Sequence, residues 1–589
     1  MRLVEIRMLD GPNTYRLEPA VKLEIVVGRR RTWYGQREPG RHSVVRLGVP
    51  IPAARAAAPA RDVAAWVRRL HALTGSAAWL VGEGRASTVG RARIPVTIHR
   101  TSEPGHWIVA YPWRERQRAE SIGEAAYRLV ELGLDPGSTR PAHSRGQRGS
   151  RTMGRALARI REAATDAPDW IRDQDRRMPA VSISGTNGKS TTTRMITHIL
   201  RTAGRRVGST TSDGVLVDGV LVEEGDLTGP MGAQQVLRDE SLDVAVLETA
   251  RGGLVLRGMG YESNEASVLT NVSSDHLDLM GLHTLPELAE VKSIVARITR
   301  SDGVAVLNAD DPLVAAVARR VRARVCLFSL SPTNRRVRSA VARGGLGLVL
   351  DDGWLVELEG DRTHRVVRAA DVPATVGGLA KHNVSNALAA AGAARALGVS
   401  IAKVADGLRD FRPSAEQAPG RLNLYRVGKR LVIVDFAHNE AGLSVVLDVV
   451  EALVGPRKTR RAPIVAIIGT AGDRPDDSLR GIGRIAAERA DEVALKETQR
   501  YLRGRSRESV LGELRAGVAA GGGNAVGLAA HEDEATALRA ALTEEGRLAA
   551  TGSAAVVLLM CQADRQSVIT AIGALGGEPV GDVSWFETA

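Results

Sequence analysis

Hydrophobic positions beyond about residue 179 follow two alternating patterns. Short continuous apolar runs, such as Ala180–Ile183, predict buried strands, and segments with apolar residues three or four apart, such as Thr192–Leu200, predict helices. The two patterns alternate to about residue 420, and again from 421 to 589. This alternation is typical of doubly wound α/β domains. We therefore predict a multidomain α/β protein with a central and a C-terminal α/β domain.

The N-terminal region has a different pattern. We expect strands at 4–9 and 23–27 and helices at 63–73 and 121–134, with the turn sequence Gly11-Pro12-Asn13 between the strands. This predicts an α+β domain over residues 1–137. Residues 138–178 begin rich in Arg, Ser and Pro and then carry a predicted helix at 154–163, so we interpret them as an Arg-rich linker. The expected domains are 1–137, 138–178, 179–420 and 421–589.

The strongest candidate for chemistry lies between the first strand and helix of the central domain. Residues 184–191 read Ser-Gly-Thr-Asn-Gly-Lys-Ser-Thr. The glycines would let backbone N–H groups approach an anion, and the helix N-terminus adds free donors and a favourable dipole. Lys189 would neutralise phosphates, and the hydroxyl of Ser190 or Thr191 would help hold Mg²⁺. The spacing departs from the common P-loop, because Ile183 stands where that motif has its first glycine; the alternative is an ordinary strand-to-helix turn.

Two further predicted strands end in polar residues. Asp243–Glu248 ends in a carboxylate, where a Walker-B-like acid would meet a metal beside the loop; the alternative for Glu248 is helix capping. A second strand leads through Asn271 to Asp275-His276-Leu277-Asp278, and we favour a metal or phosphate role for His276 over a plain surface turn. The helix predicted over Glu287–Ile298 carries Lys292, which could instead be a surface lysine paired with Glu287 or Glu290.

The shortened loop Gly185–Thr191 resembles the ATP loop of the Mur ligase family. Further motifs follow in that family's order: Asn271 with Asp275–Asp278, Leu307–Pro312, Lys381–Asn386, Pro419–Arg421 and Asp435–Asn439. Within the family, Thr210–Gly214, Gly225–Pro230 and Glu248–Leu254 look like the Mur-like part of cyanophycin synthetases, and Ile6–Asn13 resembles their N-terminal domain. Cyanophycin synthetases carry a large ATP-grasp module between these two regions, and no such module is present here.

The resemblance implies a Mur-ligase-like central P-loop ATPase domain, a Rossmann-like C-terminal domain, and a site for ATP and Mg²⁺. It implies catalytic roles for Lys189, Glu248, His276, Lys292 and Arg421, and metal binding by Ser190, Glu248, His276 and Lys292, with Lys292 carbamylated. It implies nucleotide contacts from Gly185, Thr186, Asn187, Gly188, Lys189, Ser190, Thr191, Asn383, Asn386, Arg421 and Asp435. It implies substrate contacts from Arg251, His438, Asn439, Asp473, Arg474, Arg503 and Arg505. For Asn383 a helix N-cap is the alternative, and for Arg503 and Arg505 a solvated basic loop.

Composition narrows the class of protein. Only eight of the 80 Lys and Arg residues are lysines. Lys189, Lys292 and Lys381 fall within the segments singled out above, and Lys496 ends a further predicted strand at 492–496, which indicates sites that need a compact or deprotonatable amine. The net charge of +13 fits a basic surface first and a carboxylate-rich substrate second; we see no nucleic-acid motif, and aromatics are only 3%. Two cysteines cannot form a disulfide framework. Without a signal-peptide or membrane-spanning run we expect a cytoplasmic protein with no membrane partner.

The function implied by the resemblance is an ADP-forming amide ligase. An acceptor carboxylate would attack the γ-phosphate of ATP to give an acyl phosphate, and an amine would then displace phosphate. The implied partners are an acidic peptide or other carboxylate acceptor and a free amino acid such as arginine; a separate ATP-grasp ligase and a second copy of the chain are further candidates. The alternative is a non-catalytic nucleotide-binding scaffold that regulates a separate ligase.

Overall fold

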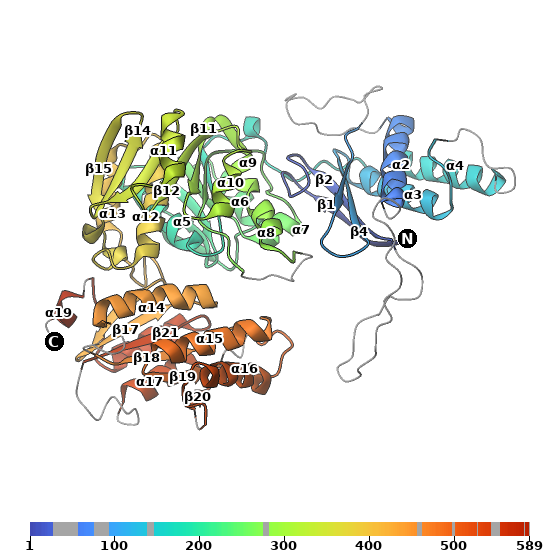
Figure 1. The fold of residues 1–589 in the computed structure, drawn as a ribbon. Helices are drawn as coiled ribbons and strands as arrows, with labels where there is room; N and C mark the ends of the chain where they lie inside the picture. The colour runs from blue at the N-terminus through green and yellow to red at the C-terminus, as the bar shows by residue number, and fades with distance from the viewer. Residues whose placement is uncertain are drawn as a thin grey trace.

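A computed structural model of the chain describes residues 1–27, 57–75, 94–137, 146–274, 282–455, 462–497, 501–526, 528–543, 554–581 and 583–587. Figure 1 shows these residues as three bodies in chain order, with the central body in contact with the other two. The predicted multidomain α/β architecture is confirmed. No helix in the described part of the chain has the length and apolar character needed to cross a bilayer.

The N-terminal body is a sheet covered by helices. Its described strands are β1 (Arg2–Leu9), β2 (Ala20–Val26), β3 (Thr97–Arg100) and β4 (His106–Pro112), which pair antiparallel in the order β1-β2-β4-β3. Its helices are α2 (Ala58–Thr74), α3 (Arg116–Glu131) and α4 (Gly146–Glu162). α4 includes the helix expected at 154–163, and its Ile160 is buried in the same hydrophobic core as residues of α2 and α3.

The N-terminal body docks on the central body through backbone hydrogen bonds. The turn after β1 donates from Asp10 N to Arg257 O (2.7 Å) and accepts from Met259 N at Pro12 O (2.9 Å) and from Gly260 N at Asp10 O (3.0 Å). The turn sequence seen in the N-terminal region therefore fixes the position of this body beside the segment that follows Glu248.

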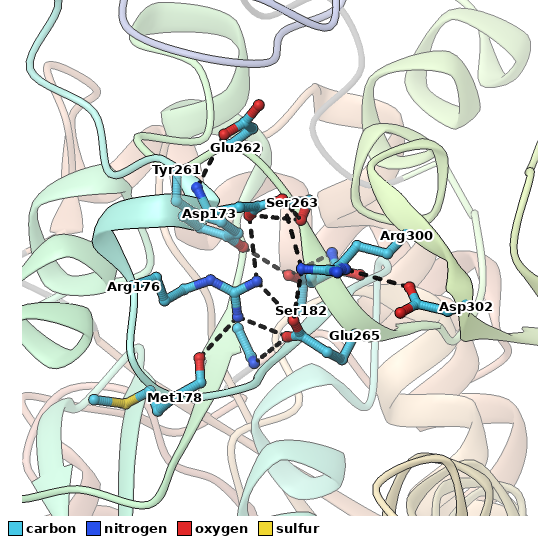
Figure 2. A network of polar contacts seen from close by, with 12 residues as sticks. Asp173, Arg176, Met178, Ser182, Tyr261, Glu262, Ser263, Glu265, Arg300 and Asp302 are labelled. Atoms are coloured by element: carbon cyan, nitrogen blue, oxygen red, sulfur yellow. Dashed lines mark hydrogen bonds and ion pairs between the residues drawn. The ribbon is translucent and has the colours of Figure 1, made fainter. Parts of the chain in front are cut away.

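A buried arginine anchors the chain where it enters the central sheet (Figure 2). The Arg176 side chain is only 4% exposed, and its guanidinium donates to both carboxylate oxygens of Glu265, at 2.6 and 2.8 Å. Glu265 also accepts from the backbone N of Ala180 at 2.7 Å. Because Ala180 begins the first strand of the central sheet, this network sets where that strand starts.

The central body is built on a mixed sheet with eleven described strands in the order β15-β14-β13-β12-β11-β10-β5-β9-β6-β7-β8. The strands are β5 (Ala180–Ser184), β6 (Val207–Thr211), β7 (Gly214–Val217), β8 (Val220–Glu224), β9 (Val244–Glu248), β10 (Asn264–Leu269), β11 (Thr299–Asn308), β12 (Arg324–Ser329), β13 (Leu346–Asp351), β14 (Trp354–Glu359) and β15 (Arg362–Arg368). The run from β13 to β6 is parallel, so the carboxyl ends of β5, β9 and β10 lie side by side.

Helices cover both faces of this parallel sheet. One face carries α5 (Lys189–Thr202), α12 (Lys381–Ala396) and α13 (Ile401–Asp410). The other carries α6 (Pro230–Arg238), α7 (Arg251–Leu256), α8 (Leu285–Lys292), α9 (Ile294–Arg297), α10 (Pro312–Val317) and α11 (Arg335–Ala342). Side chains of β9 alternate between two cores, with Val244 and Val246 in one and Ala245 and Leu247 in the other, as expected for a strand buried on both faces.

The helix predicted over 287–298 is divided in two. α8 ends at Lys292 and α9 starts at Ile294, and the hydroxyl of Ser293 between them donates to the carbonyl of Glu290 at 2.7 Å. A serine that bonds its own helix backbone in this way competes with the regular helical ladder, which gives a physical reason for the break.

The C-terminal body is a second α/β unit. Its seven described strands, in the order β20-β19-β18-β21-β17-β16-β22, are β16 (Asn423–Val427), β17 (Arg430–Asp435), β18 (Ile464–Ile468), β19 (Glu492–Lys496), β20 (Ala530–His531), β21 (Ala555–Met560) and β22 (Glu578–Pro579). Its helices are α14 (Glu440–Val454), α15 (Asp476–Arg489), α16 (Arg507–Ala520), α17 (Glu534–Leu542), α18 (Arg565–Ala574) and α19 (Ser584–Glu587). The strands from β17 to β20 run parallel, as a Rossmann-like unit requires.

Candidate active site

The glycine loop between β5 and α5 needs glycine at both of its glycine positions. Gly185 has φ +152° and Gly188 has φ +85°, which L side chains rarely adopt. A Cβ at Gly185 would collide with the hydroxyl of Thr270, and one at Gly188 with the side-chain oxygen of Asn386. The loop is therefore packed between the end of β10 and α12, with no room for a side chain at these two points.

Thr270 and Asn271, which directly follow β10, hold the glycine loop in its conformation. Asn271 accepts from Asn187 N with its side-chain oxygen (2.9 Å) and from Thr186 N with its carbonyl (2.9 Å). The hydroxyl of Thr270 donates to Asn187 O at 2.7 Å. Asn271 belongs to a motif noted in the sequence, but neither residue was expected to act on the loop, because only the pairing of β10 with β5 brings them together.

Lys189, Ser190 and Glu248 meet at this edge of the sheet. Lys189 is the first residue of α5, and its amine donates to Thr186 O at 2.9 Å. Glu248 ends β9 and is 3% exposed, and its Oε2 has no hydrogen-bond partner among the described residues. Burial raises the pKa of Glu248, although the charge of Lys189 and a hydrogen bond from Ser190 oppose the shift. The capping alternative is wrong, since Ala250 is the N-cap of the next helix and has no side-chain cap bond.

These oxygen donors fit a hard divalent cation. A hydroxyl on Ser190 and a buried carboxylate with an unpartnered oxygen on Glu248 are ligands that Mg²⁺ prefers. The described residues contain no group of three or more His, Cys, Asp or Glu that could hold a metal by themselves. His276 lies in 275–281, outside the described residues.

Lys292 reaches the same loop from the opposite face of the sheet. It is 5% exposed at the end of α8, and its amine donates to Gly185 O at 2.6 Å. The surface-lysine alternative is wrong, because Glu287 caps its own helix with Thr284, and Glu290 pairs with Arg297 and Arg320. Lys292 therefore lies next to the loop, as expected for a site residue.

The C-terminal body contributes an arginine to the loop. Arg421 Nη2 donates to Ser190 Oγ at 3.4 Å, and its guanidinium lies 4.3 Å from the ring centroid of Phe436. Burial lowers the pKa of Arg421, and the carboxylates of Asp213, Asp435 and Glu248 oppose that shift. Asp435 accepts from the backbone N of Leu422 (2.8 Å) and Ala437 (2.7 Å), so in this structure its oxygens shape the turns around Arg421.

Asn383 and Asn386 lie on α12 behind the loop. Asn383 donates to Ala374 O at 2.7 Å and accepts from Asn386 at 3.0 Å, and Asn386 accepts from the hydroxyl of Thr192 at 3.4 Å. The N-cap of α12 is Ala380, so the capping alternative for Asn383 is wrong. Both amides are buried; Asn386 packs against Gly188 of the glycine loop, and Asn383 holds Asn386 in place.

The expected substrate residues fall into three places. Arg251 begins α7, three residues after Glu248. His438 and Asn439 follow β17; Asn439 caps α14 and approaches the side-chain oxygen of Asn187 at 3.4 Å. The remaining four lie at the carboxyl ends of β18 and β19: Asp473, Arg474, Arg503 and Arg505. We call these four residues the amino-acid cluster, after the substrate that they are expected to contact.

The amino-acid cluster is held by ion pairs. Arg503 pairs with Asp473, Arg505 pairs with Asp476 at 2.6 Å and donates to Arg474 O at 3.2 Å, and Arg474 donates to Thr470 at 3.2 Å. The Arg505 side chain is 19% exposed, so the alternative of a solvated basic loop does not describe it, although Arg503 is half exposed.

Comparisons with known proteins agree with this geometry. Residues 183–394 match the Mur ligase middle domain, and residues 420–561 match the Mur ligase glutamate ligase domain. A cyanophycin synthetase of Crocosphaera subtropica is 43% identical over 331 residues, which are 56% of this chain and 37% of that protein. A UDP-N-acetylmuramoyl-L-alanyl-D-glutamate--2,6-diaminopimelate ligase of Alkalilimnicola ehrlichii is 31% identical over 55% of this chain and 62% of that protein.

Among solved structures, a bifunctional folylpolyglutamate synthase/dihydrofolate synthase is 19% identical with a TM-score of 0.47, over 68% of this chain and 89% of that one. The chain spans less than two fifths of the length of the cyanophycin synthetase that it matches. The two domain matches take in the glycine loop, Glu248, Lys292 and Arg421. Through its middle and C-terminal domains, the chain belongs to the Mur ligase family.

Proposed function

We propose that this protein is an ATP-dependent, ADP-forming amide ligase that joins an amino acid to an acidic carboxylate acceptor through an acyl phosphate. One observation carries the proposal: Arg421 of the C-terminal body reaches Ser190 of the glycine loop, beside the buried carboxylate of Glu248. A phosphate cradle, a metal-binding acid and a cation from a second body are what phosphoryl transfer to another anion requires. The names of the relatives, all synthetases or ligases, support this class.

The reaction has two steps. A carboxylate oxygen of the acceptor attacks the γ-phosphorus of ATP, the bond from that phosphorus to the β–γ bridging oxygen breaks, and ADP leaves. The amine nitrogen of the amino acid then attacks the acyl carbon, and the tetrahedral intermediate collapses with loss of inorganic phosphate and of a proton from nitrogen. The products are an amide, ADP and phosphate.

The residues of the site meet the electrostatic demand of the first step. Two anions must approach, so the ammonium of Lys189 and the guanidinium of Arg421 would offset charge on the phosphates. Ser190 and Glu248 would hold Mg²⁺, with His276 as a further ligand, and Mg²⁺ would supply Lewis-acid stabilisation of the phosphate oxygens. Asn383, Asn386 and Asp435 would complete the nucleotide site. Contact between the central and C-terminal bodies would exclude water, which otherwise hydrolyses an acyl phosphate.

We also propose that Lys292 is carbamylated in the active enzyme. Its burial, and its place 2.6 Å from the carbonyl of Gly185, support a structural role next to the phosphates. A carbamate would replace this donor with an anionic group able to bind a second Mg²⁺. Loss of activity in Lys292→Ala that is restored by short-chain carboxylic acids would support this, and the absence of a carbamate signal in ¹³C NMR of the native protein under ¹³CO₂ would contradict it.

The substrates we propose are an acidic peptide acceptor and an amino acid such as arginine. The acceptor would approach from the side of Arg251, and the amino acid would bind near His438, Asn439 and the amino-acid cluster. If the product is a polymer built from two kinds of amino acid, a separate ATP-grasp ligase would add the one that this protein does not add. We also propose that the protein can assemble with a second copy of itself. We propose that the N-terminal body docks a long acidic acceptor; unchanged affinity for that acceptor after deletion of residues 1–137 would count against it.

Isotope transfer tests the acyl phosphate directly. With an acceptor labelled with ¹⁸O in its carboxylate, one labelled oxygen should appear in the released phosphate for each amide formed. Unlabelled phosphate at full amide yield would rule the intermediate out. The scaffold alternative predicts no amide at all, and the intact Lys189, Glu248 and Lys292 disfavour it.

A further inference from the structure

Asp213 binds two arginines that come from different bodies. Asp213 follows β6; its Oδ2 accepts from Arg194 Nη2 of α5 at 2.8 Å, and its Oδ1 accepts from Arg565 Nη2 of α18 at 2.6 Å. The side chains are 10%, 7% and 30% exposed, for Asp213, Arg194 and Arg565 in that order. One largely buried carboxylate therefore joins the central body to the C-terminal body.

Both arginines also hold the segment that connects the two bodies. Arg194 Nη1 donates to Gln417 O at 3.2 Å, and Arg565 Nη1 donates to Pro419 O at 3.3 Å. Each guanidinium thus bridges one oxygen of Asp213 and one carbonyl of residues 417–419. We call Arg194, Asp213, Arg565 and these two carbonyls the hinge clamp. The clamped segment ends two residues before Arg421.

The backbone at Gly420 is built around this arrangement. Gly420 has φ +66°, and a Cβ there would lie 2.9 Å from Cδ of Arg565. Its N donates to the side chain of Asn423 at 2.6 Å, and its carbonyl accepts from Phe436 N at 2.6 Å. The position before Arg421 therefore lets Arg565 pass close to the backbone, and a side chain there would displace it.

The charges of the hinge clamp act on Arg421 as well. Burial alone would raise the pKa of Asp213, but Arg565, Arg194 and Arg421 outweigh it and hold that pKa below its ordinary value. Without this carboxylate, three guanidinium groups would face one another across the interface between the bodies. Like charges in a half-buried site repel strongly because little water screens them.

We propose that Asp213 and Arg565 are positioning residues that hold the two bodies together and place Arg421 over the glycine loop. In this proposal neither residue contacts the reacting atoms. The effect of these residues on turnover depends on the proposed ligase reaction. Their effect on how the two bodies are arranged does not depend on it.

The test measures distance between the bodies. Spin labels at Ala342→Cys in α11 and Glu508→Cys in α16 would report it by pulsed electron resonance, since both sites are exposed and the native cysteines are buried. Asp213→Asn, Arg565→Gln and Gly420→Ala should each broaden the distribution toward longer distances. Arg539→Gln, an exposed arginine on α17, is the matched control and should leave it unchanged. Circular dichroism of each labelled variant in solution before freezing verifies that it is folded.

A kinetic readout separates positioning from mere stability. Asp213→Asn should lower kcat per folded molecule about 100-fold, because a misplacement of about 1 Å can cost that much, whereas a mere loss of stability would leave kcat per folded molecule unchanged. The loss of kcat in the double variant Asp213→Asn/Arg565→Gln should be no larger than in the single variants, because both substitutions break the same ion pair. A wild-type distance distribution in folded Asp213→Asn, or additive losses in the double variant, would overturn the proposal. If no turnover is found for the wild type, the distance measurement still decides it.

Discussion

At the scale of single residues, the site is distinguished by a buried acid that the protein itself does not fully satisfy. An unpartnered buried polar atom costs about 1–3 kcal/mol, so Glu248 is expected to weaken the fold in exchange for ligand binding. The raised pKa of Glu248 has the same meaning, because burial penalises its charged form in the folded state alone.

Glu248→Gln should therefore stabilise the unliganded protein and abolish Mg²⁺-dependent nucleotide binding. The penalty is complete above the raised pKa and absent below the ordinary value of 4.5, so the gain in free energy of unfolding should be present at neutral pH, shrink as the pH falls below the raised pKa, and vanish by about pH 4.5. Urea unfolding with and without Mg²⁺ and a non-hydrolysable ATP analogue checks both parts. A destabilised variant that still binds nucleotide only with Mg²⁺ would contradict this account of Glu248.

Gly188→Ala should lower nucleotide affinity by at least about tenfold, since a displaced backbone N–H is a lost hydrogen bond to an anion, worth about 1.5–3 kcal/mol. Gly204→Ala is the matched control: φ is +85° at Gly188 and +88° at Gly204, but only Gly188 has a neighbour that a Cβ would strike. Isothermal titration with the analogue measures both. Equal losses in the two variants would mean that backbone strain, and not the contact with Asn386, matters.

The sequence was informative for residues whose role is local and weak for residues whose role depends on distant partners. Lys189 and Glu248 could be predicted because each sits at the end of a strand pattern next to a recognisable loop. Asp213 lay in a noted segment, but its partner Arg565 is 352 residues away, and no local pattern connects the two. The hinge clamp was therefore visible only in the fold.

At the scale of elements, strand and helix patterns were predictable in the middle of the central sheet, because β5 and β9 are short, mostly apolar runs in which every residue is buried. The helix predicted over 287–298 was wrong at Ser293, where a side chain competes with the backbone. For Asn383 only the N-cap alternative was wrong, because the cap is Ala380, and its nucleotide contact stays a prediction. The C-terminal body adds a feature that the sequence only suggested through its scarce lysines: Lys496 at the end of β19 is fully buried and pairs with Glu534 at 2.7 Å.

This buried pair should be a major support of the C-terminal body. Burial would raise the pKa of Glu534, but Lys496 and backbone N–H groups outweigh it and hold that pKa at about 2. Lys496→Met should lower the free energy of unfolding by about 3–5 kcal/mol, because it leaves a buried charge unpaired. Arg484→Met, which breaks an exposed pair with Glu488, should cost less than about 1 kcal/mol.

The same pair sets an acid limit on stability. The folded-state pKa of Glu534 lies below its ordinary value of 4.5, so its contribution is complete above that value and is lost as the pH falls toward about 2. Unfolding of the wild type measured across this window should show the loss, and Lys496→Met should show a smaller one. An equal acid dependence in both proteins would argue against the pair as its source.

At the scale of the whole molecule, one edge of the central sheet organises the chemistry. The glycine loop, Glu248 and Asn271 follow adjacent parallel strands, Lys292 arrives from the covering helix, and Arg421 arrives from the next body. The Asp10–Pro12 turn fixes the N-terminal body to residues 257–260, which follow α7, and the amino-acid cluster lies in the C-terminal body. A ligase with an acceptor on one side and an amine on the other fits this layout.

The most direct test is ADP release with Mg²⁺ and ATP across a matrix of acidic acceptors and free amino acids, with Lys189→Ala as the control. The proposed function predicts that ADP appears only when one particular acid and one particular amine are both present, with amide formed in equal amount, and that Lys189→Ala is inactive. ADP release that needs neither acid nor amine, or that persists undiminished in Lys189→Ala, would contradict it.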